Sequence, residues 1–152
     1  MEKKPIIIPE NINLFHLKIV KSDIISKSSY SENIDFKINA AHTTMHNLPL
    51  NRLKIGLIID IIGEINTKEI ETKAHFNIDF HFQIKDLNNF YTLDKKNLPV
   101  FSSALITTLL GISFSTARGL IYERLNDTDL DGVILPVVSP QEILKSRISN
   151  SK

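Results

Sequence analysis

Histidine and aspartate side chains at alternate positions are the first residues of this sequence that could do chemistry. His75, Asp79 and His81 fall on one face of a segment in which polar and apolar residues alternate, the pattern of a β-strand with one wetted side. Alternate residues on a strand stand about 6.6 Å apart, whereas zinc ligands must approach a shared ion to about 2 Å. The pattern therefore predicts a solvated polar face of a sheet and no metal site.

His42 and His46 form a second pair, and residues four apart share one face wherever the chain is helical. Asn47 and Pro49 follow at once and are typical of a turn. We therefore expect a turn here, not a helix, and no metal site.

The segment from Asp127 to Gly132 is superficially similar to a calcium-binding EF-hand loop, because it reads Asp-Thr-Asp-Leu-Asp-Gly. Val138 stands where that loop needs a bidentate glutamate, so we predict a plain turn. The sequence shows no serine–histidine–aspartate motif, no phosphate-binding loop and no dinucleotide fingerprint. We therefore predict a protein that is not an enzyme and needs no cofactor.

Length and composition predict a single ordinary globular domain over residues 1–152. The chain is 42% hydrophobic and 23% charged, with a net charge of +1 and no cysteine. The missing cysteine excludes disulfides and thiolate metal sites. The balanced charge provides no positive field that would attract nucleic acid.

Neither a secretion signal nor a membrane span is expected. The apolar run Ile6–Ile8 has three residues, well short of the roughly 7–15 that a signal peptide needs. Residues 97–117 carry no charge, but seven serines and threonines are spread through them, which weakens insertion into lipid. We expect a cytoplasmic protein.

Four runs between about residues 12 and 86 have the pattern of β-strands. Apolar and polar side chains alternate most regularly in 34–39 and 76–84. Residues 53–65 are rich in β-branched side chains, and 14–25 is a less regular fourth candidate. Strands in series without helices between them predict an antiparallel sheet that is wetted on one side. Residues 87–97 are polar and irregular, and we expect a loop there.

One long helix is predicted from about residue 98 to 125, with Pro99 in its first turn, where a missing N–H costs little. One stripe along it is made of small residues, and two further stripes, expected on different sides, are apolar. A helix that is apolar or small on every side needs cover on every side, whereas one sheet covers only one. We therefore expect self-association. The small residues predicted at that interface are Ala104, Thr108, Gly111 and Ser115.

A short helix is predicted over about 139–148, with Ser139 as N-cap, Pro140 at its first position and Glu142 closing a capping box. The fold class is thus α+β: a four-stranded antiparallel sheet followed by a long helix and a short C-terminal helix. The strands and the apolar run at 133–138 hold more apolar surface than one helix can cover. Apolar grooves that bind segments of other proteins are therefore expected.

In four stretches the sequence resembles the SecB family of export chaperones. These stretches are 18–24, 34–39, 110–119 and 133–144. They follow the order and spacing of that family's first two strands, long helix and C-terminal end. The match spans about residues 13–147. It implies a SecB-like fold, assembly as a dimer of dimers through the long helices, and ATP-independent binding of unfolded client proteins in apolar grooves.

The resemblance also implies site residues. The client-binding groove would contain Ile34, Phe36, Ile38, Ile134, Leu135, Val137, Ile143 and Leu144. In that family, acidic residues on the sheet face dock the motor protein SecA, and Asp23 and Asp79 are the candidates here.

Two departures from the family leave the partner open. The net charge is +1 where the family is strongly acidic, and Lys27 stands where a further acid is expected. SecB-like proteins also include chaperones that hold the antitoxin of a toxin–antitoxin system. An export holdase and a dedicated chaperone for one partner are therefore both kept, and so are a dimer and a tetramer.

Overall fold

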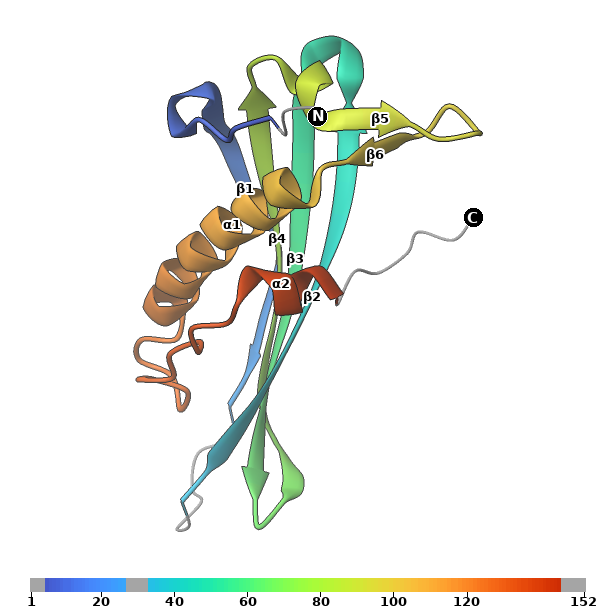
Figure 1. The fold of residues 1–152 in the computed structure, drawn as a ribbon. Helices are drawn as coiled ribbons and strands as arrows, with labels where there is room; N and C mark the ends of the chain where they lie inside the picture. Colours follow the sequence, from blue (N-terminus) through green and yellow to red (C-terminus); the bar gives the residue numbers. More distant parts are fainter. Residues whose placement is uncertain (1–4, 27–32, 146–152) are drawn as a thin grey trace.

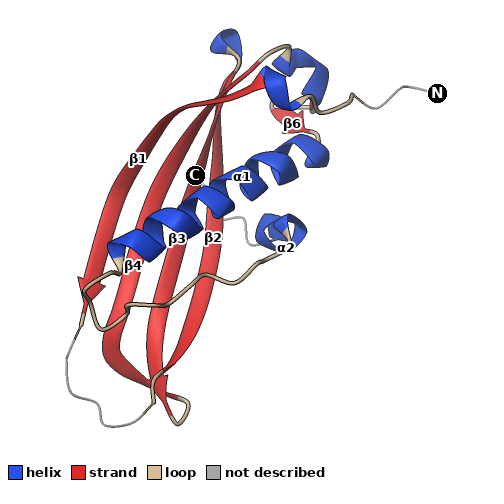
Figure 2. Cartoon of the chain, turned by 90° about the vertical axis from the view of Figure 1, so that its left-hand side faces the viewer, coloured by secondary structure: helices blue, strands red, loops and turns tan. Residues whose placement is uncertain are grey.

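The computed structural model describes residues 5–26 and 33–145, apart from the side chains of Pro140 and Ile143. Its main layer is a four-stranded antiparallel sheet in the order β1-β4-β3-β2, and a long helix crosses one face of it (Figures 1 and 2). The predicted α+β class is confirmed. The strands and α-helices in chain order are β1 (Ile12–Ile25), β2 (Asp35–Asn47), β3 (Arg52–Ile65), β4 (Lys68–Ile84), β5 (Tyr91–Leu93), β6 (Pro99–Phe101), α1 (Ser103–Arg124) and α2 (Pro140–Lys145).

The two faces of the sheet differ because apolar and polar residues alternate along its central strands. On the face toward α1, every other residue of β3 from Leu53 to Ile61 is buried, as is every other residue of β4 from Ala74 to Ile84. The intervening residues of β4, from His75 to Gln83, are only partly buried. The prediction of a sheet wetted on one side is confirmed.

The second strand is longer than the sequence indicated. It pairs with β3 residue by residue through Asn47, so His42 and His46 lie in the strand, and the expectation of a turn at this pair is wrong. The turn starts only after the strand, as a 3-10 helix over Leu48–Leu50, where the Asn47 side chain accepts a hydrogen bond from the Leu50 N–H at 3.4 Å.

Residues 87–101 form neither a loop nor the start of the helix. A 3-10 helix over Leu87–Phe90 leads into the β5–β6 hairpin, in which Leu93 pairs with Pro99. The Asp94 carboxylate closes the hairpin turn by accepting from the N–H groups of Lys96 (2.7 Å) and Leu98 (2.9 Å). The predicted helix start at residue 98, with Pro99 in its first turn, is therefore wrong. Ser102 is the N-cap instead, since its Oγ accepts from the Leu105 N–H at 3.1 Å.

The long helix buries one broad face. Apart from Ser113, its buried residues come from both predicted apolar stripes. Together they cover about half of the helix circumference: Leu105, Ile106, Leu109, Leu110, Ser113, Phe114, Ala117 and Ile121. The expectation that these stripes need separate partners is therefore wrong, because they merge into one face that packs into the core with the sheet. By length and composition α1 could cross a membrane. Its apolar face is buried inside this domain.

Residues 125–138 cross the sheet as an irregular segment and lead to α2 (Figure 2). The Arg118 guanidinium of α1 holds this segment by donating to the carbonyls of Leu135 (3.1 Å) and Pro136 (3.3 Å). Ser139 caps α2, with its Oγ accepting from the Glu142 N–H at 3.3 Å. The last three positions of the predicted helix, 146–148, lie outside the described residues.

Candidate functional site

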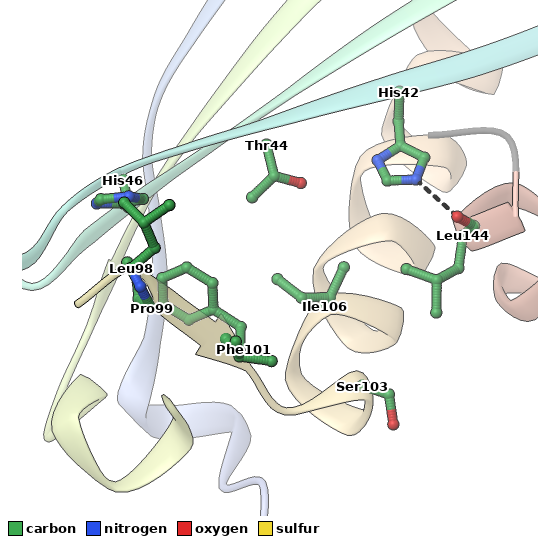
Figure 3. Close-up of a pocket in the computed structure, with 10 residues that line it drawn as sticks. His42, Thr44, His46, Leu98, Pro99, Phe101, Ser103, Ile106 and Leu144 are labelled. Carbon is green, nitrogen blue, oxygen red and sulfur yellow. Dashed lines mark hydrogen bonds between the residues drawn. The ribbon is translucent and has the colours of Figure 1, made fainter. Parts of the chain in front are cut away.

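A cavity of about 400 Å³ opens between the C-terminal half of β2, the β5–β6 hairpin, the start of α1 and α2 (Figure 3). We call it the β2 groove. The residues that line it are His42, Thr44, His46, Leu98, Pro99, Val100, Phe101, Ser103, Ile106 and Leu144.

One wall of the groove is the inner face of β2. His42, Thr44 and His46 are alternate residues of this strand, so the wall follows the strand direction for about 14 Å. His42 is fully buried, and its Nε2 lies 3.2 Å from the Leu144 carbonyl oxygen. A carbonyl only accepts hydrogen bonds, so Nε2 is the donor and the bond joins α2 to β2.

The opposite wall is apolar. Leu98 is 55% exposed at the hairpin, and Phe101 packs its ring against those of Tyr91 (5.7 Å) and His46 (5.8 Å). Ile106, which lies near the start of α1, also lines this wall. Among residues 5–26 and 33–145, no lysine, arginine, aspartate or glutamate lines the groove. The groove therefore combines an apolar wall, which suits apolar side chains, with the polar side chains of β2 on the other wall.

The predicted groove residues lie in three different surroundings. Leu144 lines the β2 groove, whereas Phe36 and Ile38 are partly buried on the same inner face nearer the start of β2, and Ile34 comes just before that strand. Leu135 is buried in the core. Ile134 and Val137 are exposed by 61% and 88%, respectively, and the side chain of Ile143 lies outside the described part.

Sequence reasoning missed most of the groove wall. A signal for His42, Thr44 and His46 was present, since they continue the period of two that starts at Phe36. Leu98 and Phe101 had none, because nothing in the sequence separates a three-residue strand from the start of a helix.

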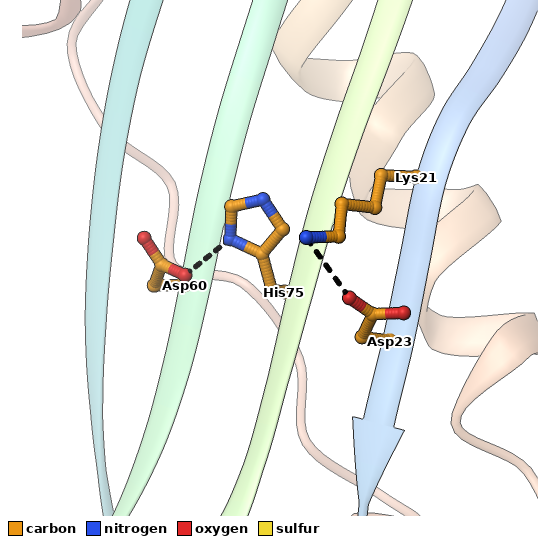
Figure 4. Close-up of polar contacts among 4 residues, drawn as sticks. All are labelled: Lys21, Asp23, Asp60 and His75. Atoms are coloured by element: carbon orange, nitrogen blue, oxygen red, sulfur yellow. Dashed lines mark hydrogen bonds and ion pairs between the residues drawn. The ribbon is translucent and has the colours of Figure 1, made fainter.

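The outer face of the sheet carries lysine–aspartate ion pairs and a histidine–aspartate hydrogen bond. Asp23 lies 3.3 Å from the Lys21 ammonium, Asp79 lies 3.5 Å from that of Lys54, and His75 Nδ1 lies 2.6 Å from an Asp60 oxygen. Figure 4 shows the row that cross-strand register creates from Asp23 through His75 to Asp60. The two acids predicted to dock SecA thus share one face, each beside a lysine, and their role stays a prediction.

A second histidine pair lies at the hairpin end of this face. The rings of His16 and His81 are 5.1 Å apart, and the Phe15 ring lies 6.1 Å from that of His81. Burial first, and then the neighbouring His16, lower the pKa of His81 below its usual 6.5. Within residues 5–26 and 33–145, no group of three or more histidine, aspartate or glutamate side chains could hold a metal ion.

The small stripe of α1 faces away from the sheet. Ala104 and Ser115 are exposed, and Thr108 and Gly111 are partly so. Thr107, Thr108, Gly111, Ile112, Ser115 and Thr116 line a shallow depression there. The predicted oligomer interface is thus available on the surface of one chain, and its occupation stays a prediction.

Comparison with known proteins identifies the fold. No protein-family model matches the sequence, and neither does any curated protein. The structure is similar to that of the Mycobacterium tuberculosis Rv1957 SecB-like chaperone in complex with a ChAD peptide from the Rv1956 HigA1 antitoxin, with a TM-score of 0.63. The chain has the SecB-like fold. The match covers 86% of this chain and 92% of the other at 9% sequence identity, so the resemblance seen in the sequence is confirmed at the level of the fold.

Proposed function

We propose that the protein is an ATP-independent holdase chaperone that binds unfolded or non-native polypeptides in the β2 groove. The observation that carries this proposal is an open groove on a SecB-like fold, with one apolar wall and no lysine, arginine, aspartate or glutamate among the described residues that line it. Burial of apolar surface has no preferred direction and needs no particular sequence, which suits clients without fixed structure. The M. tuberculosis chaperone with this fold binds an antitoxin peptide.

The binding surface extends beyond the groove along β2. Ile34, Phe36 and Ile38 continue the inner face toward the start of this strand, and Ile134 and Val137 expose further apolar surface on the segment that leads to α2. An unfolded chain longer than the groove would bury these residues as well. Leu144 belongs to the groove itself.

Self-association through the exposed stripe of α1 is part of the proposal. Ala104, Thr108, Gly111 and Ser115 allow close approach of a second helix, as in a dimer of dimers. The protein would act in the cytoplasm, where clients are still unfolded.

Suppression of aggregation tests this function. A chemically denatured model protein is diluted into buffer without ATP, and light scattering is followed with and without the protein. Leu144→Asp and Phe36→Asp are expected to weaken suppression, because each places a carboxylate on the apolar surface. Asn88→Asp, at an exposed polar position, is the control. Full suppression by both variants would remove Leu144 and Phe36 from the binding surface.

A dedicated chaperone for one partner, such as an antitoxin, is the second candidate. The specific observation in its favour is the antitoxin peptide bound to the structurally similar chaperone. The pairing of Asp23 and Asp79 with lysines also leaves little free acidic charge at those positions to dock SecA. Purification of the protein from its native host separates the two: one stoichiometric partner supports the dedicated role, and a spread of clients supports the general holdase.

A further inference from the structure

The two edges of the sheet are built differently. β1 is interrupted by register shifts at Phe15 and Val20, and it carries Lys18 and Lys21. Bulges and lysines are the devices by which edge strands avoid pairing with other chains. β2 pairs with β3 without a shift over all 13 residues. Its Asp35 and Lys37 lie at the start of the strand, and residues 38–47 contain no lysine, arginine, proline, aspartate or glutamate.

The unguarded edge lies beside the groove. Within the part of the chain that the structure describes, β2 is the last strand on its side of the sheet, with β3 as its sole partner. Alternate residues of an edge strand direct their backbone N–H and C=O groups away from the sheet, where another strand can pair with them about 4.8 Å away. His42, Thr44 and His46 of this strand line the groove, so edge and groove run in the same direction.

We infer that an extended segment of the client adds to the outer edge of β2 as a fifth strand of the sheet. Its backbone pairs with β2, and its alternate side chains point into the β2 groove. This inference rests on the proposed function and names the client chemistry: about five extended residues, uncharged, apolar at every second position, and without proline where the backbone must donate.

A second copy of the chain fits this edge less well. If two β2 strands paired, the partner's inner-face residues would remain packed on the partner's own core, as Ile38 and Ala40 are in this chain. They would leave the groove unfilled. An unfolded client has free side chains for both the edge and the groove.

Peptides with methylated backbones test the pairing. Overlapping eleven-residue fragments of a denatured model protein are screened by fluorescence anisotropy, and the tightest binder is remade with N-methyl groups at the even or at the odd positions of its central five residues. One series is expected to bind at least tenfold more weakly, because its lost N–H groups faced β2, while the other binds within about threefold of the parent. Equal affinities of the two series would overturn strand addition.

Amide hydrogen exchange by NMR gives the same answer from the protein's side. The bound peptide is expected to slow exchange at least tenfold at alternate residues within 41–46, and to leave the β1 edge unchanged. Protection of those β2 amides that rises with concentration in the free protein would show that a second copy takes the edge, and would overturn the inference. If no fragment binds at all, the proposed function fails. If fragments bind without the alternating pattern, only strand addition fails.

Discussion

Replacing Leu98 by aspartate is expected to weaken client binding about tenfold without unfolding the protein. Leu98 lines the β2 groove with 55% of its surface exposed. Full burial of a leucine is worth about 1.5–3 kcal/mol, so a client that covers the exposed part contributes about 0.8–1.6 kcal/mol. Since about 1.4 kcal/mol is a factor of ten, losing this contact gives about a tenfold change, and desolvation of the new carboxylate adds to it.

Leu93→Asp is the matched control for this prediction. Leu93 lies on the same hairpin and is also 55% exposed, but it does not line the groove. Affinity for the tightest peptide fragment is measured by fluorescence anisotropy, and thermal unfolding is followed by circular dichroism for both variants. The reasoning is refuted if the two variants lose affinity equally, or if Leu98→Asp binds as the parent does.

Three further predictions concern stability, assembly and titration. Gly63→Ala is expected to lower the free energy of unfolding in urea by about 1–3 kcal/mol, because the new Cβ would lie 2.8 Å from the Thr72 carbonyl oxygen. Gly119→Ala, whose new Cβ would have no atom within 4 Å, should raise it by about 0.5–1 kcal/mol. The reverse ranking of the two variants would contradict this. Gly111→Arg should shift the mass in sedimentation toward the monomer, with Asn88→Arg as control; an unchanged mass would exclude the small stripe as the interface. His81 should titrate below 6.5 by NMR, and His16→Asn should raise that pKa. Because its pKa is lowered on folding, His81 costs stability as the pH falls through 6.5 toward the lowered value and costs nothing well above 6.5, so His81→Gln should flatten that loss.

The main architecture was predictable because it depends on periodicity. Alternation in β3 and β4 places one apolar set against α1, and the positions buried there include Ile55, Phe76 and Phe80. The cap at Ser139 was also predictable, since serine followed by proline and then glutamate has a local physical cause. These features require only residues that are close in sequence.

The groove depends on tertiary structure and was therefore largely hidden. Asn47 and Pro49 are turn residues and predict a turn at the end of β2, yet pairing with β3 extends the strand as far as Asn47. Pro99 is compatible both with the first turn of a helix and with a short edge strand. The hairpin turn that Asp94 closes decides for the strand, and it brings Leu98 and Phe101 to the cavity.

The geometry of the sheet explains why apolar surface stays uncovered in so small a domain. β4 has 17 residues and is about 55 Å long, whereas the 22 residues of α1 span about 33 Å. One helix therefore cannot cover the inner face. The remainder lies under the irregular segment after α1, whose residues in the core are few, and under a helix of six residues. Short, irregular cover buries less apolar area than a long helix does, so the surplus apolar surface is found there and along β2.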